Sequence, residues 1–156
     1  MSSLGAIGSY LPPSDGLLPK WLLFIAVVSI GNSVQAYVSL AGTREVYSGS
    51  SATTTQTTGS GDTKTSTTSP VNELSARTFG TWTALSSIVR LYTAYNIHDP
   101  LVYQLCLWTY GLAFAHFVSE WLVFGSAKWG RGLVSPLIVS TVTGVWMLSQ
   151  WDSYVR

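Results

Sequence analysis

The sequence predicts an all-α integral membrane protein built as a bundle of four helices. Three observations favour this fold class. Of the 156 residues, 47% are apolar and only 10% are charged, whereas soluble domains usually carry about a quarter charged residues. Four apolar runs each approach the roughly 20 residues that cross a bilayer. Two of these runs are joined by only a few polar residues, so their helices must lie antiparallel.

The chain begins with a segment that we expect to be an irregular leader. Residues 1–19 contain Gly, Ser and a pair of prolines without a periodic apolar face. The first apolar run follows at about residues 20–40; it is longer than the apolar core of a cleaved signal and has no basic run before it. We therefore expect a retained transmembrane helix. Asn32 and Gln35 are costly against lipid, so they are expected to face other helices.

A low-complexity segment separates the first helix from the rest. Residues at about 48–69 are almost wholly Ser, Thr and Gly. Such a composition buries little apolar surface. We expect a flexible surface loop that carries no chemistry.

Residues 74–124 contain a helical hairpin around which the other elements are arranged. The second and third helices are predicted at about 77–97 and 101–124. The elbow between them holds Asp99 and Pro100. An Asp side chain accepts hydrogen bonds from the free N–H groups at a helix start, and proline at the first position lacks a donor that would stay unpaired there. We therefore expect Asp99 to cap the third helix.

A Gly-rich loop leads to the fourth apolar run at about residues 133–151. Pro136 is expected in the first turn of this helix, where proline costs little. With four spans, both termini and the elbow at Asp99 lie on one side of the membrane. The single cysteine, Cys106, lies within an apolar run, so a packed, inert thiol is expected rather than a disulfide.

Ionisable residues within the expected spans are candidates for function, because burying them is expensive. His116 and Glu120 are four residues apart and share one face of the third helix. They are either an acid and base pair acting on a lipid-like substrate, or a proton relay, or part of a hydrogen-bond network in which Glu120 meets His116 or Arg77. Two intramembrane groups are a weak catalytic signature, so the packing role is favoured.

The third ionisable candidate, Arg90, lies about two turns from the elbow end of its helix by the 1.5 Å rise per residue. A long side chain at this depth is expected to snorkel to the nearby interface. In depth it is too far from Glu120 to pair with it directly.

Recognisable cofactor chemistry is missing from the sequence. His98 and His116 are too few for the multi-histidine cluster of a membrane di-iron oxygenase, and no glycine fingerprint follows a strand. We therefore expect no cofactor and no metal site. A net charge of +1 offers no basic face for nucleic acid.

The apolar runs resemble those of a known family. The stretches LPKWLLFIAVVSIGNSVQAY, LSARTFGTWTALSSIVRLYTAYNI, LWTYGLAFAHFVSEWLVF and GRGLVSPLIVSTVTGVWM closely resemble the ergosterol biosynthetic protein 28 family, small endoplasmic reticulum membrane proteins of fungi with relatives in other eukaryotes. The resemblance covers nearly the whole chain apart from its first residues and the Ser/Thr-rich loop, which is longer than the family pattern.

The resemblance implies a non-enzymatic scaffold in the endoplasmic reticulum membrane. Members of the family are understood to tether the sterol C-4 methyl oxidase, the C-3 sterol dehydrogenase/decarboxylase and the 3-keto sterol reductase. The resemblance also implies a contact with the sterol methyltransferase. The sequence leaves open whether the protein forms a homo-oligomer. The family supplies no catalytic residues, so we name only candidate packing or docking positions: Asn32, Gln35, Arg77, Trp82, Arg90, His116, Glu120 and Trp121.

Two other function classes stay open on the sequence alone. A cofactor-free intramembrane sterol isomerase would use His116 and Glu120 to move a proton across a ring double bond. A small transporter or channel is less favoured, because the four spans show no evident inverted repeat and few polar stripes.

Overall fold

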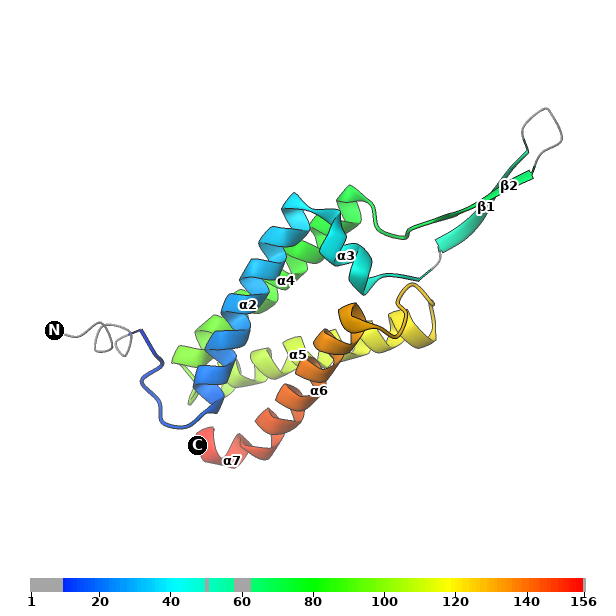
Figure 1. The fold of residues 1–156 in the computed structure, drawn as a ribbon. Coiled ribbons are helices and arrows are strands. Elements are labelled where there is room, and N and C mark those ends of the chain that lie inside the picture. The colour runs from blue at the N-terminus through cyan, green and yellow to red at the C-terminus, as the bar shows by residue number, and fades with distance from the viewer. Residues whose placement is uncertain (1–9, 50, 58–62, 156) are drawn as a thin grey trace.

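The computed structural model describes residues 10–49, 51–57 and 63–155. Within these residues the predicted all-α bundle is confirmed (Figure 1). The long helices are α2 (Leu18–Val38), α4 (Glu73–Tyr95), α5 (Pro100–Leu122) and α6 (Arg131–Ser149). Two short helices, α3 (Leu40–Val46) and α7 (Trp151–Tyr154), follow α2 and α6. The long helices begin one to four residues before the predicted positions.

The long helices are arranged as two pairs, α2 with α4 and α5 with α6. Figure 1 shows the pairs meeting where α4 turns into α5 and diverging toward α3, which lies between them. The described residues near both termini gather at the elbow, because Tyr95 Oη donates to the carbonyl of Tyr10 and His98 Nδ1 lies 2.9 Å from the carbonyl of Tyr154. Tyr10 and Tyr154 therefore lie beside the elbow, while the terminal residues 1–9 and 156 lie outside the described residues.

Side chains at the helix starts explain where α4 and α5 begin. Asp99 accepts hydrogen bonds from the N–H groups of Leu101 (2.9 Å) and Val102 (3.1 Å), as predicted for the cap of α5. Asn72 accepts from the N–H of Ser75, whose hydroxyl accepts in turn from the N–H of Asn72. This reciprocal capping box starts α4 before the expected position.

The expected place of Pro136 is wrong. Because α6 begins at Arg131, Pro136 is the sixth residue of the helix and lies beyond its first turn. The carbonyl of Gly130 already accepts hydrogen bonds from Leu133 (3.1 Å) and Val134 (2.9 Å), which places the helix start earlier. At this position proline cannot donate to the carbonyl four residues before it, that of Gly132.

Two antiparallel strands occupy most of the segment where we expected a flexible surface loop. Strands β1 (Ser51–Thr57) and β2 (Thr63–Thr68) are antiparallel, with Ser51 opposite Thr68 and Thr57 opposite Thr63. Threonine is β-branched and favours an extended backbone, which the low apolar content of this segment concealed. Figure 1 shows the ribbon extending away from the helices.

Among the described residues, three helices, α2, α5 and α6, are long and apolar enough to cross a membrane. Helix α4 is less apolar, since it holds Glu73, Arg77 and Arg90 besides several Ser and Thr residues. Its 23 residues nevertheless extend about 34 Å by the helical rise. It packs beside α2 and connects the α3 end of the body to the elbow end, so the chain runs the length of the body four times.

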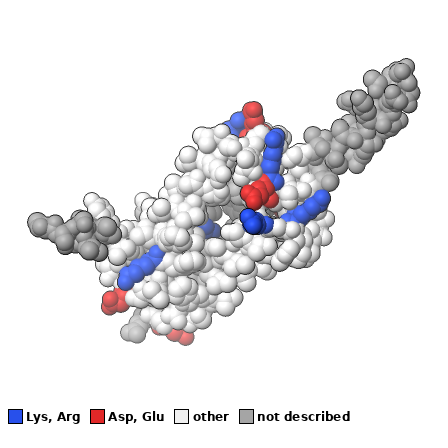
Figure 2. All heavy atoms as spheres, in the orientation of Figure 1, with Lys and Arg blue, Asp and Glu red and all other residues white. Residues whose placement is uncertain are grey.

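The surface has the charge distribution of a protein embedded in lipid. Figure 2 shows acidic and basic side chains near the two ends of the helical body and an almost uncharged band between them. Exposed large apolar side chains lie on every long helix, among them Phe24, Leu85, Leu112 and Val145. Such exposure is stable in lipid rather than in water. The chain is therefore a multi-pass membrane protein.

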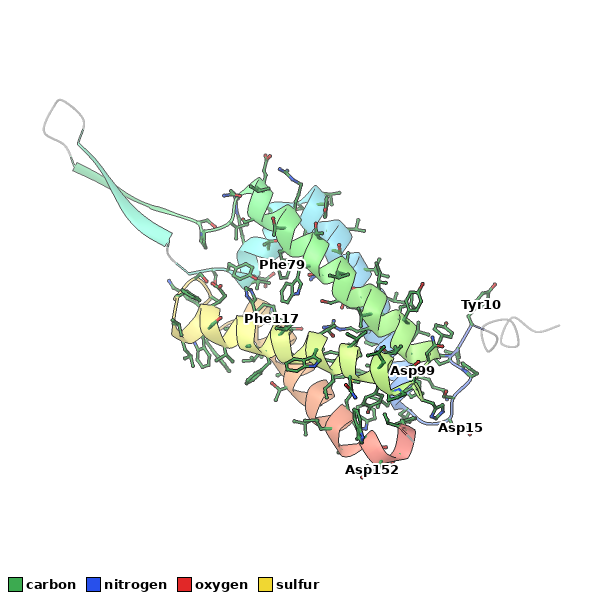
Figure 3. The ribbon with its side chains drawn as sticks, turned by 180° about the vertical axis from the view of Figure 1, so that it is seen from behind. Tyr10, Asp15, Phe79, Asp99, Phe117 and Asp152 are labelled. Carbon is green, nitrogen blue, oxygen red and sulfur yellow. The ribbon has the colours of Figure 1, made fainter. Side chains whose placement is uncertain are left out.

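Two apolar clusters hold the helix pairs together. The cluster at the elbow end includes Leu22, Ile97, Tyr103 and Cys106, all fully buried, which confirms the packed thiol. The cluster at the other end contains Ala113, Phe117, Ala127 and Leu133, with Phe79 packed against it. Figure 3 shows Phe79 and Phe117 toward the α3 end and Asp99 at the opposite end. The space between these clusters forms the site described next.

Candidate functional site

A cavity of about 480 Å³ lies between the two helix pairs where they diverge. Its volume falls within the roughly 300–1,000 Å³ of small-molecule pockets. Helices α2, α3, α4, α5 and α6 all contribute to its wall, and we call it the central cavity. At the α3 end, the exposed lining residues include Asn32, Gln35, Glu45 and Arg131. Farther in, Arg90 and Tyr110 are buried, so the cavity leads from an exposed mouth to a buried cation.

Arg90 does not snorkel to the interface, so that prediction is wrong. Its side chain points into the bundle and is 8% exposed. Its Nε donates to Thr109 Oγ1 (3.3 Å) and its Nη1 donates to Ser29 Oγ (3.3 Å), and its Cζ lies 4.2 Å from the centre of the Tyr110 ring. A cation over an aromatic face is attracted by the ring quadrupole. Arg90 therefore joins α4 to α2 and α5.

A second group of residues surrounds His116 near the end of α5, and we call it the His116 cluster. The His116 ring lies 5.1 Å from the Trp82 ring and 5.3 Å from the Phe117 ring, measured between ring centroids. A hydrogen bond of 2.7 Å joins His116 Nε2 to the hydroxyl of Tyr47. Through this bond and these aromatic contacts, α5 is held to α4 and to the segment that follows α3.

Tyr47 and Glu120 are the polar neighbours of His116, and each of them makes a hydrogen bond in the structure. Glu120 Oε1 lies 3.9 Å from His116 Nδ1, which is too long for a hydrogen bond, and the other carboxylate oxygen accepts a hydrogen bond from the Ser126 hydroxyl. Burial raises the pKa of Tyr47, and the nearby Glu120 carboxylate raises it further. The Tyr47 phenol therefore stays protonated and neutral in its hydrogen bond.

The geometry favours a packing role for His116 and Glu120. An acid and base pair must reach a substrate within hydrogen-bond distance. Neither residue lines the central cavity, whereas Trp82 of the same cluster does. The predicted pairing of Glu120 with Arg77 does not form, because Arg77 Nη1 lies 3.6 Å from Glu73 Oε2 on the exposed surface of α4.

The structure separates the remaining sequence candidates. Asn32 and Gln35 lie at the mouth of the central cavity, whose lining also includes Trp82 of the His116 cluster but not His116 or Glu120. Trp121 lies at the end of α5 and packs against Trp129, with 4.9 Å between ring centroids. The eight candidates therefore lie in three regions. The central cavity is lined by Asn32, Gln35, Trp82 and Arg90, His116 and Glu120 lie in the His116 cluster, and Arg77 and Trp121 lie outside both.

Sequence reasoning missed three residues that shape these places. Tyr47 follows a short helix that we did not expect, and no spacing rule relates it to His116 in the sequence. Ser29 and Thr109 hold Arg90, although each lies in an apolar run where a lone hydroxyl is ordinary. Among the described residues, no group of three or more His, Cys, Asp or Glu side chains is placed to hold a metal ion.

The fold and the cavity define a small helical membrane protein with several spans. Residues 18–145 match the family model described as Erg28 like protein. The chain belongs to this family.

Relatives from distant eukaryotes align along most of the chain. Ergosterol biosynthetic protein 28 of Candida albicans is 47% identical over 154 residues, which cover 98% of this chain and 99% of the relative. The protein of the same name from Saccharomyces cerevisiae is 44% identical over 89% of this chain and 83% of its own length. The Homo sapiens homolog is 34% identical over 85% and 83%. No solved structure matches the chain.

Proposed function

We propose that this protein is a non-enzymatic scaffold of the endoplasmic reticulum membrane that serves ergosterol biosynthesis. Its partners are the sterol C-4 methyl oxidase, the C-3 sterol dehydrogenase/decarboxylase and the 3-keto sterol reductase, with the sterol methyltransferase as a further partner. One observation carries the proposal: relatives named ergosterol biosynthetic protein 28 align with almost the whole chain at up to 47% identity.

The proposed mechanism is a raised effective concentration of sequential enzymes. Linked partners meet one another far more often than free ones, and no new contact between them is required. A poorly soluble sterol then passes between active sites in the plane of the membrane. The exposed apolar faces of α2, α4, α5 and α6 offer surfaces for helix contacts within lipid.

The rival hypothesis of a sterol isomerase finds no support in the site. It requires His116 and Glu120 to face a substrate, but both lie outside the lining of the central cavity. Tyr47 is hydrogen-bonded to His116 Nε2, and Ser126 is hydrogen-bonded to one carboxylate oxygen of Glu120. The pair is better explained as a link between α5 and the segments around it.

Affinity purification tests the scaffold directly. The tagged protein is isolated from membranes in a mild detergent, and co-purified proteins are quantified against an unrelated membrane protein of the endoplasmic reticulum. We expect the C-4 demethylation enzymes to be enriched. Deleting the protein is expected to weaken their mutual association and to raise the level of 4-methyl sterols.

A double variant separates the scaffold from the isomerase. Replacing His116 and Glu120 by Gln removes any acid and base function and leaves side chains of similar size. A folded scaffold variant keeps its partners and restores sterol composition in the deletion strain, whereas an isomerase variant does not. The scaffold proposal is wrong if the deletion changes neither the association of the enzymes nor the 4-methyl sterols.

A further inference from the structure

The central cavity ends at a cation that has no neutralising partner among the described residues. Arginine stays protonated in proteins. Among the described residues, Arg77 lies within 4.0 Å of the Glu73 carboxylate and His116 lies within 4.0 Å of the Glu120 carboxylate, whereas Arg90 has no carboxylate within that distance. Its hydrogen bonds to Ser29 and Thr109 reach neutral hydroxyls and use two of its five N–H donors. An unpaired buried charge is costly, so the site favours an anion.

Tyr110 forms the wall beside Arg90. It lines the cavity and is 1% exposed, and Arg90 Cζ lies 4.2 Å from the centre of its ring. The Tyr110 hydroxyl is enclosed by protein near Thr143, so it does not open into the cavity. Arg90 is therefore the group at this end of the cavity whose hydrogen-bonding capacity is left open.

The rest of the cavity suits a hydrophobic body. The lining residues of α4 run from Phe79 to Arg90, a distance of about 16 Å by the helical rise. Apolar side chains from α2, α5 and α6 face the same space: Ile25, Val28, Ala113, Phe117 and Val139. An elongated, partly apolar cavity with a cation at its buried end matches an amphiphile with one anionic group. Arginine binds a carboxylate through two parallel hydrogen bonds.

We propose that the central cavity binds a sterol carboxylate, with Arg90 as the counter-ion of the carboxylate. The cavity and its cation are features of the structure and do not depend on the scaffold role, but the choice of a sterol carboxylate rests on the proposed function. An oxidase that converts a C-4 methyl group to a carboxyl group, followed by a decarboxylase that releases this group as CO₂, must pass a carboxylate from one to the other. The scaffold then holds the intermediate between them.

Two radiolabelled sterols that differ only at C-4 test the proposal. One carries a 4α-carboxylate and the other a 4α-methyl group, and each is titrated against the full-length protein in nanodiscs of neutral phosphatidylcholine. We expect the carboxylate to bind about 10- to 100-fold more tightly, as charged hydrogen bonds imply. Equal binding of both sterols, or binding of neither, overturns the proposal. Displacement of the carboxylate by phosphatidylserine added to the nanodiscs assigns the site to anionic lipid instead and also overturns it.

Two matched variants assign the preference to Arg90. Arg90→Gln removes the cation from the cavity, and Arg44→Gln removes an exposed cation of α3 that does not line it. We expect Arg90→Gln to lose the preference for the carboxylate and Arg44→Gln to keep it. A preference that survives Arg90→Gln excludes this site.

A third variant covers the case in which Arg90→Gln does not fold. Ala113→Leu enlarges a side chain of the cavity wall and leaves Arg90 in place. It must weaken the binding of both sterols, and unchanged binding contradicts the proposal.

Co-purification of the enzymes with Arg90→Gln separates this proposal from the scaffold. If folded Arg90→Gln protein still co-purifies with the enzymes but no longer binds the sterol carboxylate preferentially, both the scaffold and the cavity proposals are supported. Sterol binding without enzyme association refutes the scaffold alone.

Discussion

A single methyl group at Gly132 tests how closely α3 and α6 approach. A Cβ built on Gly132 would lie 2.3 Å from the carbonyl oxygen of Glu45, 2.4 Å from its carbonyl carbon and 2.7 Å from the nitrogen of Val46. Ordinary contact begins at 3.4 Å, so α3 would have to move by about 1 Å in a densely packed contact. Since α3 forms part of the cavity mouth, Gly132→Ala disturbs that mouth as well.

The expected magnitude follows from two opposing terms. Replacing glycine by alanine within a helix stabilises it by up to about 1 kcal/mol. Overpacking costs about 1–3 kcal/mol, and here every clashing atom is backbone that cannot rotate away. With an overpacking cost near the upper end of its range, about 3 kcal/mol, and a helix gain of about 1 kcal/mol, we expect Gly132→Ala to lower the free energy of unfolding by about 2 kcal/mol overall.

Unfolding of the purified protein in mixed micelles of dodecylmaltoside and SDS, followed by circular dichroism, measures this change. Gly111→Ala is the matched control, because a Cβ at Gly111 meets no atom within 4 Å. The control is expected to gain up to about 1 kcal/mol from helix propensity alone. If Gly132→Ala is as stable as Gly111→Ala, the close approach of α3 to α6 is refuted.

Three further substitutions test the polar contacts with the same unfolding assay. Tyr47→Phe deletes the hydrogen bond to His116 and is expected to cost about 1–2 kcal/mol; an unchanged free energy would show that the bond does not hold α5. Asp99→Ala removes the cap of α5 and is expected to cost about 1 kcal/mol, while a neutral result would exclude the cap. Arg77→Gln is expected to stay within about 0.5 kcal/mol, because its pair with Glu73 is exposed; a larger loss would reveal a contact of Arg77 that this structure lacks.

Helices α2 and α4 approach each other closely at Gly80. A Cβ at Gly80 would lie 2.9 Å from the Tyr37 ring. Ser33 Oγ donates to the carbonyl of Gly80 at 2.7 Å. Small residues in an apolar run predict that some helix comes close, but they do not identify which helix it is.

The sequence by itself determined the class of fold and the places where the chain turns. Runs of apolar residues have the length that a bilayer requires, and local chemistry marks the elbow at Asp99. The same local character explains why Cys106 was correctly expected to be buried. Each of these conclusions depends on residues that are neighbours in the chain.

Only the tertiary structure decided which way the polar side chains point. In a membrane helix, apolar residues occur on all sides, so the pattern does not reveal the face that meets another helix. Arg90 was therefore expected at the interface, whereas the packing of α4 turns it inward to Ser29 and Thr109. The partner of His116 is Tyr47, 69 residues away. The central cavity has the same origin, because it exists only where the two helix pairs diverge.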